Sequence, residues 1–215
     1  MMPPDQIPNA PLTLISVRRN RYQAVLELSD GETLTMPRAM LKERPYRGGT
    51  LFDRDAFRAF IKNRAYPFAM ERAVSLLSVR ARTEKELRSA LRESAYPQEA
   101  IDRVIDYLRE AGYVNDLDFA ARWASSRTAK GLGSRRIQME LRHKGVDTET
   151  IEQAMDDLGE DAQLGAALMA ARKAARGKDL SSPQDRQKVL AALARRGFGF
   201  SLARRALDHV RSELE

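Results

Sequence analysis

The side chains that could do chemistry in this 215-residue chain are arginines and lysines that stand close together in the sequence. A guanidinium or ammonium group can bind a phosphate or a carboxylate through charge-assisted hydrogen bonds. We therefore expect a basic surface that contacts nucleic acid or an acidic protein; the alternative is a solvated face without a partner, which is common for surface arginines. The first candidates are Arg135, Arg136, Lys144, Arg195, Arg196, Arg204 and Arg205.

Groups suited to catalysis or metal binding are scarce. The sequence has no cysteine and only two histidines, His143 and His209. This composition excludes disulfides, thiol nucleophiles and cysteine-based zinc sites. The segment 131–134 (Gly-Leu-Gly-Ser) lacks the spacing of a phosphate-binding loop, and no predicted strand precedes it. We expect a protein that is not an enzyme and that needs no metal or cofactor.

The formal net charge of +7 is unevenly distributed along the chain. It is +4 over residues 1–67, 0 over 68–114, −2 over 115–160 and +5 over 161–215. Basic segments at the beginning and the end therefore flank a neutral to acidic middle. This arrangement favours a polyanion bound near the ends and a protein partner bound between them.

The sequence gives no signal for a membrane or for secretion. It contains no apolar run long enough to span a bilayer, and its first residues lack the charged-then-apolar pattern of a signal peptide. We expect a cytoplasmic protein that does not bind membranes and that acts as a monomer.

The first part of the chain is typical of a small β segment. Apolar residues alternate between 22 and 28, Asp30-Gly31 is a preferred hairpin dipeptide, and a further strand is expected over 32–36. An earlier strand over 12–17 would connect through a turn at 18–21. A short helix over 37–44 could cover the apolar face of these three strands.

From about residue 53 onward the apolar residues follow the helical period. Asn115 and Ser182 are placed as N-caps, and Pro183 suits a first helical position. Gly112, Gly145 and Gly197 stand where a left-handed residue ends a helix. The region therefore contains several helices with defined ends.

A repeat is the main organising feature of the helical region. Six apolar positions recur after a shift of 50 residues and again after a further 52. A leading helix before each set makes three helices per unit, so the pattern predicts a mainly α fold of tandem three-helix repeats in an elongated, curved solenoid. The predicted domains are a β segment at 1–52 and repeats at 53–114, 115–160 and 161–215. The recurring residues are Leu87, Leu91, Ile101, Val104, Ile105 and Leu108; Ile137, Leu141, Ile151, Ala154, Met155 and Leu158; and Val189, Leu193, Ala203, Ala206, Leu207 and Val210.

Three aromatic residues near the start of the second repeat allow two interpretations. Tyr113, Phe119 and Trp123 could form a platform on which nucleic-acid bases stack. Because Phe119 and Trp123 are four residues apart on one helix, the simpler interpretation places these two in the core.

Several short strings, in this order and spacing, resemble the RecX family of regulatory proteins over roughly residues 68–211. Each string alone mostly states how a helix begins or ends; together they are specific. They are Arg82-Thr83-x-x-Glu86-Leu87-x-x-x-Leu91; Gly112-Tyr113-Val114-Asn115-Asp116-x-x-Phe119-Ala120-x-x-Trp123-x-x-x-Arg127; Gly131; Arg135-Arg136-Ile137; Glu140-Leu141-x-x-Lys144-Gly145-Val146; and Leu193-Ala194-Arg195-Arg196-Gly197-Phe198.

The resemblance implies a protein that binds the filament of RecA on single-stranded DNA, in its groove across neighbouring protomers. It also implies inhibition of the recombinase, ATPase and co-protease activities of RecA, and thereby modulation of recombination and the SOS response. Weak binding of single- and double-stranded DNA alone is expected. The resemblance also adds Arg82, Arg127 and Lys130 to the basic surface that is expected to bind RecA or DNA.

Two other functions remain open on the residues alone. A stand-alone DNA-binding protein would bind bare DNA tightly and with a steep dependence on salt. A solenoid that contacts only proteins would be indifferent to charge reversal at the arginine pairs.

Overall fold

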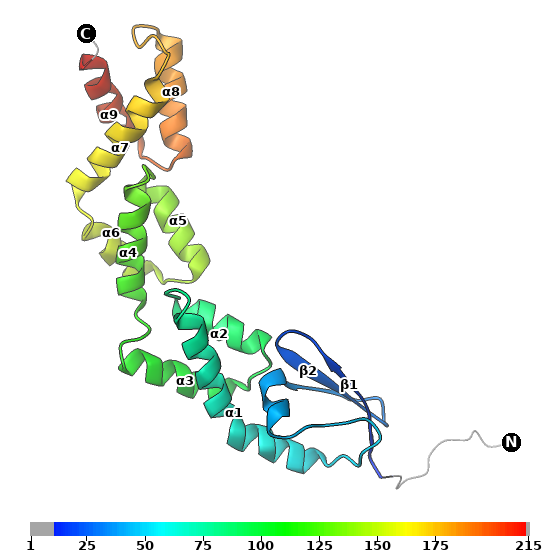
Figure 1. Ribbon diagram of the computed structural model, residues 1–215. Coiled ribbons are helices and arrows are strands. Elements are labelled where there is room, and N and C mark those ends of the chain that lie inside the picture. Colours follow the sequence, from blue (N-terminus) through cyan, green and yellow to red (C-terminus); the bar gives the residue numbers. More distant parts are fainter. Residues whose placement is uncertain (1–10, 214–215) are drawn as a thin grey trace, which may run out of the picture. The chain divides into compact units, whose positions relative to one another are not determined.

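A computed structural model describes residues 11–213 of the chain (Figure 1). Two compact units are present. One runs to Arg82 and includes Glu86–Val114; the other comprises Thr83–Lys85 and the described chain from Asn115 onward. The elongated, curved arrangement expected for the whole chain stays a prediction.

The first unit begins with the predicted three-stranded sheet. Strands β1 (Leu14–Arg19), β2 (Gln23–Leu28) and β3 (Thr33–Pro37) are antiparallel in the order β1-β2-β3. The first turn differs from the prediction, because β1 continues through Arg19 and the chain reverses at 20–22. The Asn20 carboxamide oxygen accepts from the backbone N–H groups of Tyr22 and Gln23, both at 2.8 Å, and so closes a local turn.

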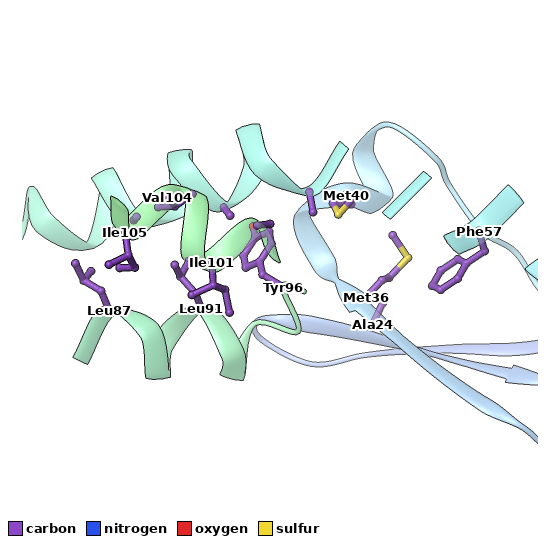
Figure 2. Packing of buried hydrophobic residues seen from close by; sticks show 14 of the residues in the cluster. Ala24, Met36, Met40, Phe57, Leu87, Leu91, Tyr96, Ile101, Val104 and Ile105 are labelled. Atoms are coloured by element: carbon purple, nitrogen blue, oxygen red, sulfur yellow. The ribbon is translucent and has the colours of Figure 1, made fainter. Parts of the chain in front are cut away.

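The apolar face of the sheet is covered within the first unit. Ala24 and Met36 from the strands pack near Met40 of η1 (Arg38–Lys42) and Phe57 of α1 (Arg54–Leu77), as Figure 2 shows. The short helix expected over 37–44 is thus one 3₁₀ turn. Helix α1 begins where Asp53 accepts hydrogen bonds from the N–H groups of residues 55 and 56.

The first three-helix bundle consists of α1, α2 (Glu84–Glu93) and α3 (Gln98–Glu110). Leu87 and Leu91 of α2 face Ile101 and Ile105 of α3 in Figure 2, and these four residues and Val104 of α3 are fully buried. The apolar stripe predicted from the helical period is therefore the core of this bundle.

The second unit contains two more bundles of the same kind (Figure 1). One consists of α4 (Asp116–Thr128), α5 (Ser134–Lys144) and α6 (Thr148–Asp156). The other consists of α7 (Glu160–Ala175), α8 (Pro183–Arg195) and α9 (Phe200–Ser212). Each has its own apolar cluster. All recurring positions are buried except Leu158, which is half-buried, so the mainly α architecture of tandem three-helix repeats is confirmed.

The helix ends agree with the predicted caps. Asn115 accepts from the N–H of Asp118 at 3.0 Å, and Gly145 and Gly197 have φ of 87° and 91°. Ser182 stands at the N-cap of α8 with Pro183 at the first turn, but its side chain makes no capping hydrogen bond.

The bundles of the second unit are joined at their glycines. The Gly133 N–H donates to the Arg196 carbonyl at 2.9 Å, and the Arg135 N–H donates to the Gly197 carbonyl at 3.1 Å. A β-carbon on Gly133 would lie 2.4 Å from the Gly197 carbonyl carbon, and one on Gly197 would lie 2.4 Å from the Arg136 nitrogen. The start of α5 therefore meets the end of α8 with no room for a side chain.

Among residues 11–213, no helix combines the length and the apolar character that a membrane span requires.

We predict opposite effects for two glycine substitutions in the second unit. Gly133→Ala should lower the free energy of unfolding by about 1–3 kcal/mol, because its methyl group collides with backbone. Gly165→Ala should raise it by about 0.5–1 kcal/mol, because this glycine lies within α7 and its β-carbon meets nothing within 4 Å. Urea unfolding followed by the fluorescence of Trp123, the single tryptophan, measures both. Equal effects of the two variants would contradict the close backbone contact.

Candidate functional site

The contact of Gly133 with Gly197, which we call the glycine junction, brings four predicted basic residues to one place. Arg135 and Arg136 stand at the start of α5, and Arg195 and Arg196 stand at the end of α8. Arg196 is half-buried, and its Nη1 donates to the Gly131 carbonyl at 3.1 Å. The other three side chains are exposed.

A second group of cations surrounds Glu140 on α5. Oε2 of Glu140 accepts from Arg127 Nε at 2.8 Å and from Trp123 Nε1 at 3.1 Å, and Oε1 accepts from Arg136 Nε at 3.3 Å. Partial burial raises the pKa of Glu140, but the hydrogen bonds from Arg136 and Arg127 and the charge of Arg127 outweigh it, so the pKa lies below its usual value. One carboxylate thus orients two arginines.

The faces of Trp123 are occupied by neighbouring side chains. The Arg127 guanidinium lies 4.0 Å from the centre of its ring, and Lys144 Nζ lies 4.4 Å away. Phe119 stacks on Trp123 with ring centres 5.7 Å apart. Phe119 is buried and Trp123 is half-buried, so the core interpretation holds for Phe119 and partly for Trp123. Trp123 is therefore not a free stacking platform, because its ring makes cation–π contacts with Arg127 and Lys144.

A basic hollow lies between α4, α7 and α8. Its volume is about 410 Å³. Five of its lining side chains are cationic, three are apolar, and none is acidic. The lining residues are Lys130, Arg172, Lys173, Arg176 and Arg196, with Ala129, Met169 and Ala170.

The sequence prediction found only part of this surface. Lys130 and Arg196 line the hollow, but Arg172, Lys173 and Arg176 were missed. Their signal in the sequence is the basic run of residues 172–178 at the end of α7, Arg-Lys-Ala-Ala-Arg-Gly-Lys. Because the hollow is formed by three helices from two bundles, spacing along the chain does not reveal it.

Three predicted residues lie apart from these clusters. Arg204 and Arg205 are exposed on α9, where Arg204 approaches Asp208 at 3.9 Å. Arg82 belongs to the first unit; it is half-buried, its Nε donates to the Leu76 carbonyl at 3.2 Å, and burial lowers its pKa. Their part in a common binding surface stays a prediction.

The chemistry that this arrangement of side chains suits is the binding of anions. Within the described part of the chain, no group of three or more His, Cys, Asp or Glu side chains could hold a metal ion. Guanidinium and ammonium groups from several helices converge instead, as phosphate or carboxylate recognition requires.

The low pKa of Glu140 predicts a dependence of stability on pH. A carboxylate whose pKa is lower in the folded than in the unfolded state contributes its full stabilisation above the unfolded value of about 4.3 and loses it as the pH falls through the folded value. The advantage of the unaltered chain over Glu140→Gln should therefore shrink between about pH 6 and pH 3.

Urea unfolding at several pH values tests this. Glu152→Gln, an exposed carboxylate on α6, controls for the loss of a charge. An advantage over Glu140→Gln that stays constant or grows toward low pH would contradict the assigned role.

Comparisons with known proteins place all three bundles in one family. Residues 69–108 match the RecX first three-helix domain, residues 115–155 the second and residues 161–207 the third. The chain is 37% identical over 147 residues to the regulatory protein RecX of Mycolicibacterium vanbaalenii, with 65% of this chain and 78% of that protein covered. It is 41% identical over 134 residues to the regulatory protein RecX of Mycolicibacterium smegmatis, with 60% and 71% covered.

Solved structures share the fold. A crystal structure of regulatory protein RecX aligns with a TM-score of 0.62 at 22% identity, over 93% of this chain and 100% of that one. RecX from Lactobacillus salivarius aligns with a TM-score of 0.65 at 21% identity, over 68% and 97%. With the three domains matched in order and close relatives aligned over most of their length, the chain belongs to the RecX family of regulatory proteins.

Proposed function

We propose that this chain regulates RecA by binding the filament that RecA forms on single-stranded DNA. The proposed binding site is the groove of the filament, where the chain would contact neighbouring protomers. Bound there, the chain inhibits the recombinase, ATPase and co-protease activities and so modulates recombination and the SOS response. The observation that carries the proposal is the presence of all three RecX domains in order on one chain.

The geometry of the second unit suits binding to a polymer. Its helices have 9 to 16 residues, which corresponds to about 13–24 Å at 1.5 Å per residue. Consecutive bundles of this size can contact successive protomers of a polymer. The exposed cations at the glycine junction can pair with carboxylates of the filament or with DNA phosphates. The proposal includes a cytoplasmic monomer that binds single- and double-stranded DNA weakly on its own.

The direct test is the ATPase of RecA on single-stranded DNA. The purified chain should lower the rate when it is present at substoichiometric amounts, because one bound chain occupies more than one protomer. Unchanged hydrolysis at equimolar chain would contradict the proposal. Unchanged hydrolysis together with tight, salt-sensitive binding of bare DNA would favour the stand-alone DNA-binding protein.

A charge-reversal variant tests whether the basic surface takes part. Arg195→Glu, Arg204→Glu and Arg205→Glu combined should raise the concentration needed for half-inhibition by about tenfold or more, since each replaced cation is exposed. The matched variant reverses Arg122, Arg142 and Lys188, which are exposed elsewhere in the second unit. Equal inhibition by both variants and by the unaltered chain would favour a protein-binding solenoid that does not use these charges.

A further inference from the structure

The basic hollow carries more positive charge than is needed to balance the partial negative charges at the helix ends around it. Helices α4, α7 and α8 all end at it, and cations are commonly found near such ends because each C-terminus carries about half a negative charge. Three ends amount to about −1.5. The five lining cations exceed this even after Glu213, which pairs with Arg172, is included.

Two of the five cations are held in place by the protein. Arg172 donates to Glu213 through Nε at 2.9 Å and Nη2 at 2.5 Å, and these bonds hold the pKa of Glu213 below its usual value. Arg196 donates to the carbonyl of Gly131, which has a φ of 71°. A β-carbon on Gly131 would lie 3.0 Å from the Met169 methyl group and 3.4 Å from Arg196 Nη1. This wall of the hollow is therefore closely packed and preorganised.

The other three cations have no anionic partner. Within residues 11–213, Lys130, Lys173 and Arg176 form no ion pair and no side-chain hydrogen bond, and all three are exposed. Because these three cations repel one another, an anion that enters the hollow lowers the repulsion. It is also attracted by all three cations at once.

The side chains that line the hollow indicate which class of anion it binds. No aromatic side chain lines the hollow, so a nucleobase has nothing on which to stack. The apolar lining is limited to two alanines and Met169, and no strand edge lies in the described part of the second unit, so an acidic peptide finds neither side-chain pockets nor backbone pairing. A phosphodiester group needs neither, because cations alone neutralise it.

We propose that the hollow formed by Lys130, Arg172, Lys173, Arg176 and Arg196 is a binding site for the phosphodiester backbone of a nucleic-acid strand, independent of base sequence. The inference deepens the proposed function, on which it rests for the source of the strand: a nucleoprotein filament supplies one. The site lies at the junction of the second and third bundles, so a strand bound there depends on both.

The test is the salt dependence of binding to a dye-labelled oligo(dT) strand, measured by fluorescence anisotropy. The variant Lys130→Gln, Lys173→Gln and Arg176→Gln removes the three unpartnered cations. The slope of log affinity against log salt concentration should fall by about two, since each single-strand phosphate contact contributes about 0.7. The affinity at low salt should fall by about tenfold or more.

The matched control is Arg122→Gln, Arg142→Gln and Lys188→Gln, which removes the same charge from exposed positions of the same unit outside the hollow. It should leave the slope nearly unchanged. An equal loss in both variants would overturn the site, because net charge alone would then explain binding. Displacement of the strand by polyglutamate as readily as by unlabelled oligo(dT) would also overturn it in favour of an acidic peptide.

The RecA ATPase assay on the same variants separates the two proposals. If the unaltered chain does not inhibit RecA but the hollow variant still loses salt slope, the proposed function fails and the phosphate site stands. If the hollow variant inhibits RecA fully and its slope equals that of the control, the phosphate site alone fails.

Discussion

The contact between Gly133 and Gly197 is the constraint on which the rest of the second unit depends. The backbone at the start of α5 donates two hydrogen bonds to the backbone at the end of α8, at a separation that excludes a β-carbon on either glycine. This contact fixes the start of α5 against the end of α8. The exposed arginines of the two helices therefore lie together, and the end of α4, which leads into the same loop, faces α7 across the basic hollow. The absence of a β-carbon at these two glycines therefore determines where cationic side chains from two bundles lie close together.

Electrostatics explains why so many cations can share this unit. Glu140 accepts from two arginines and from Trp123, whose ring also lies against Lys144. These contacts compensate cations within the middle bundle. The third bundle has fewer carboxylates, and three of its cations, Arg172, Lys173 and Arg176, stand together at the end of α7. One part of the basic surface is thus oriented by internal partners, and the other part is left for an external anion.

The sequence predicted those features that a single helix or hairpin determines. The recurring apolar positions became the three bundle cores because burying one stripe of each helix requires that period. The turn after β1 was misplaced because the side chain of Asn20 closes it, a local hydrogen bond that the alternation of apolar residues does not report. Arg172, Lys173 and Arg176 were missed because their proximity to Lys130, which belongs to the other bundle, comes from the junction between the two bundles. A spacing of more than 40 residues carries no sign of that proximity.

Amide hydrogen exchange of Gly133 and Arg135, measured by nuclear magnetic resonance, tests the central contact most directly. Both N–H groups stand at the start of α5, where a helix has no internal acceptor for them, so they would exchange rapidly if the bundles were independent. We expect protection of both amides close to that of Leu141 in the core of α5, because each donates to the end of α8. Exchange of both amides at the rate of an open loop would contradict it.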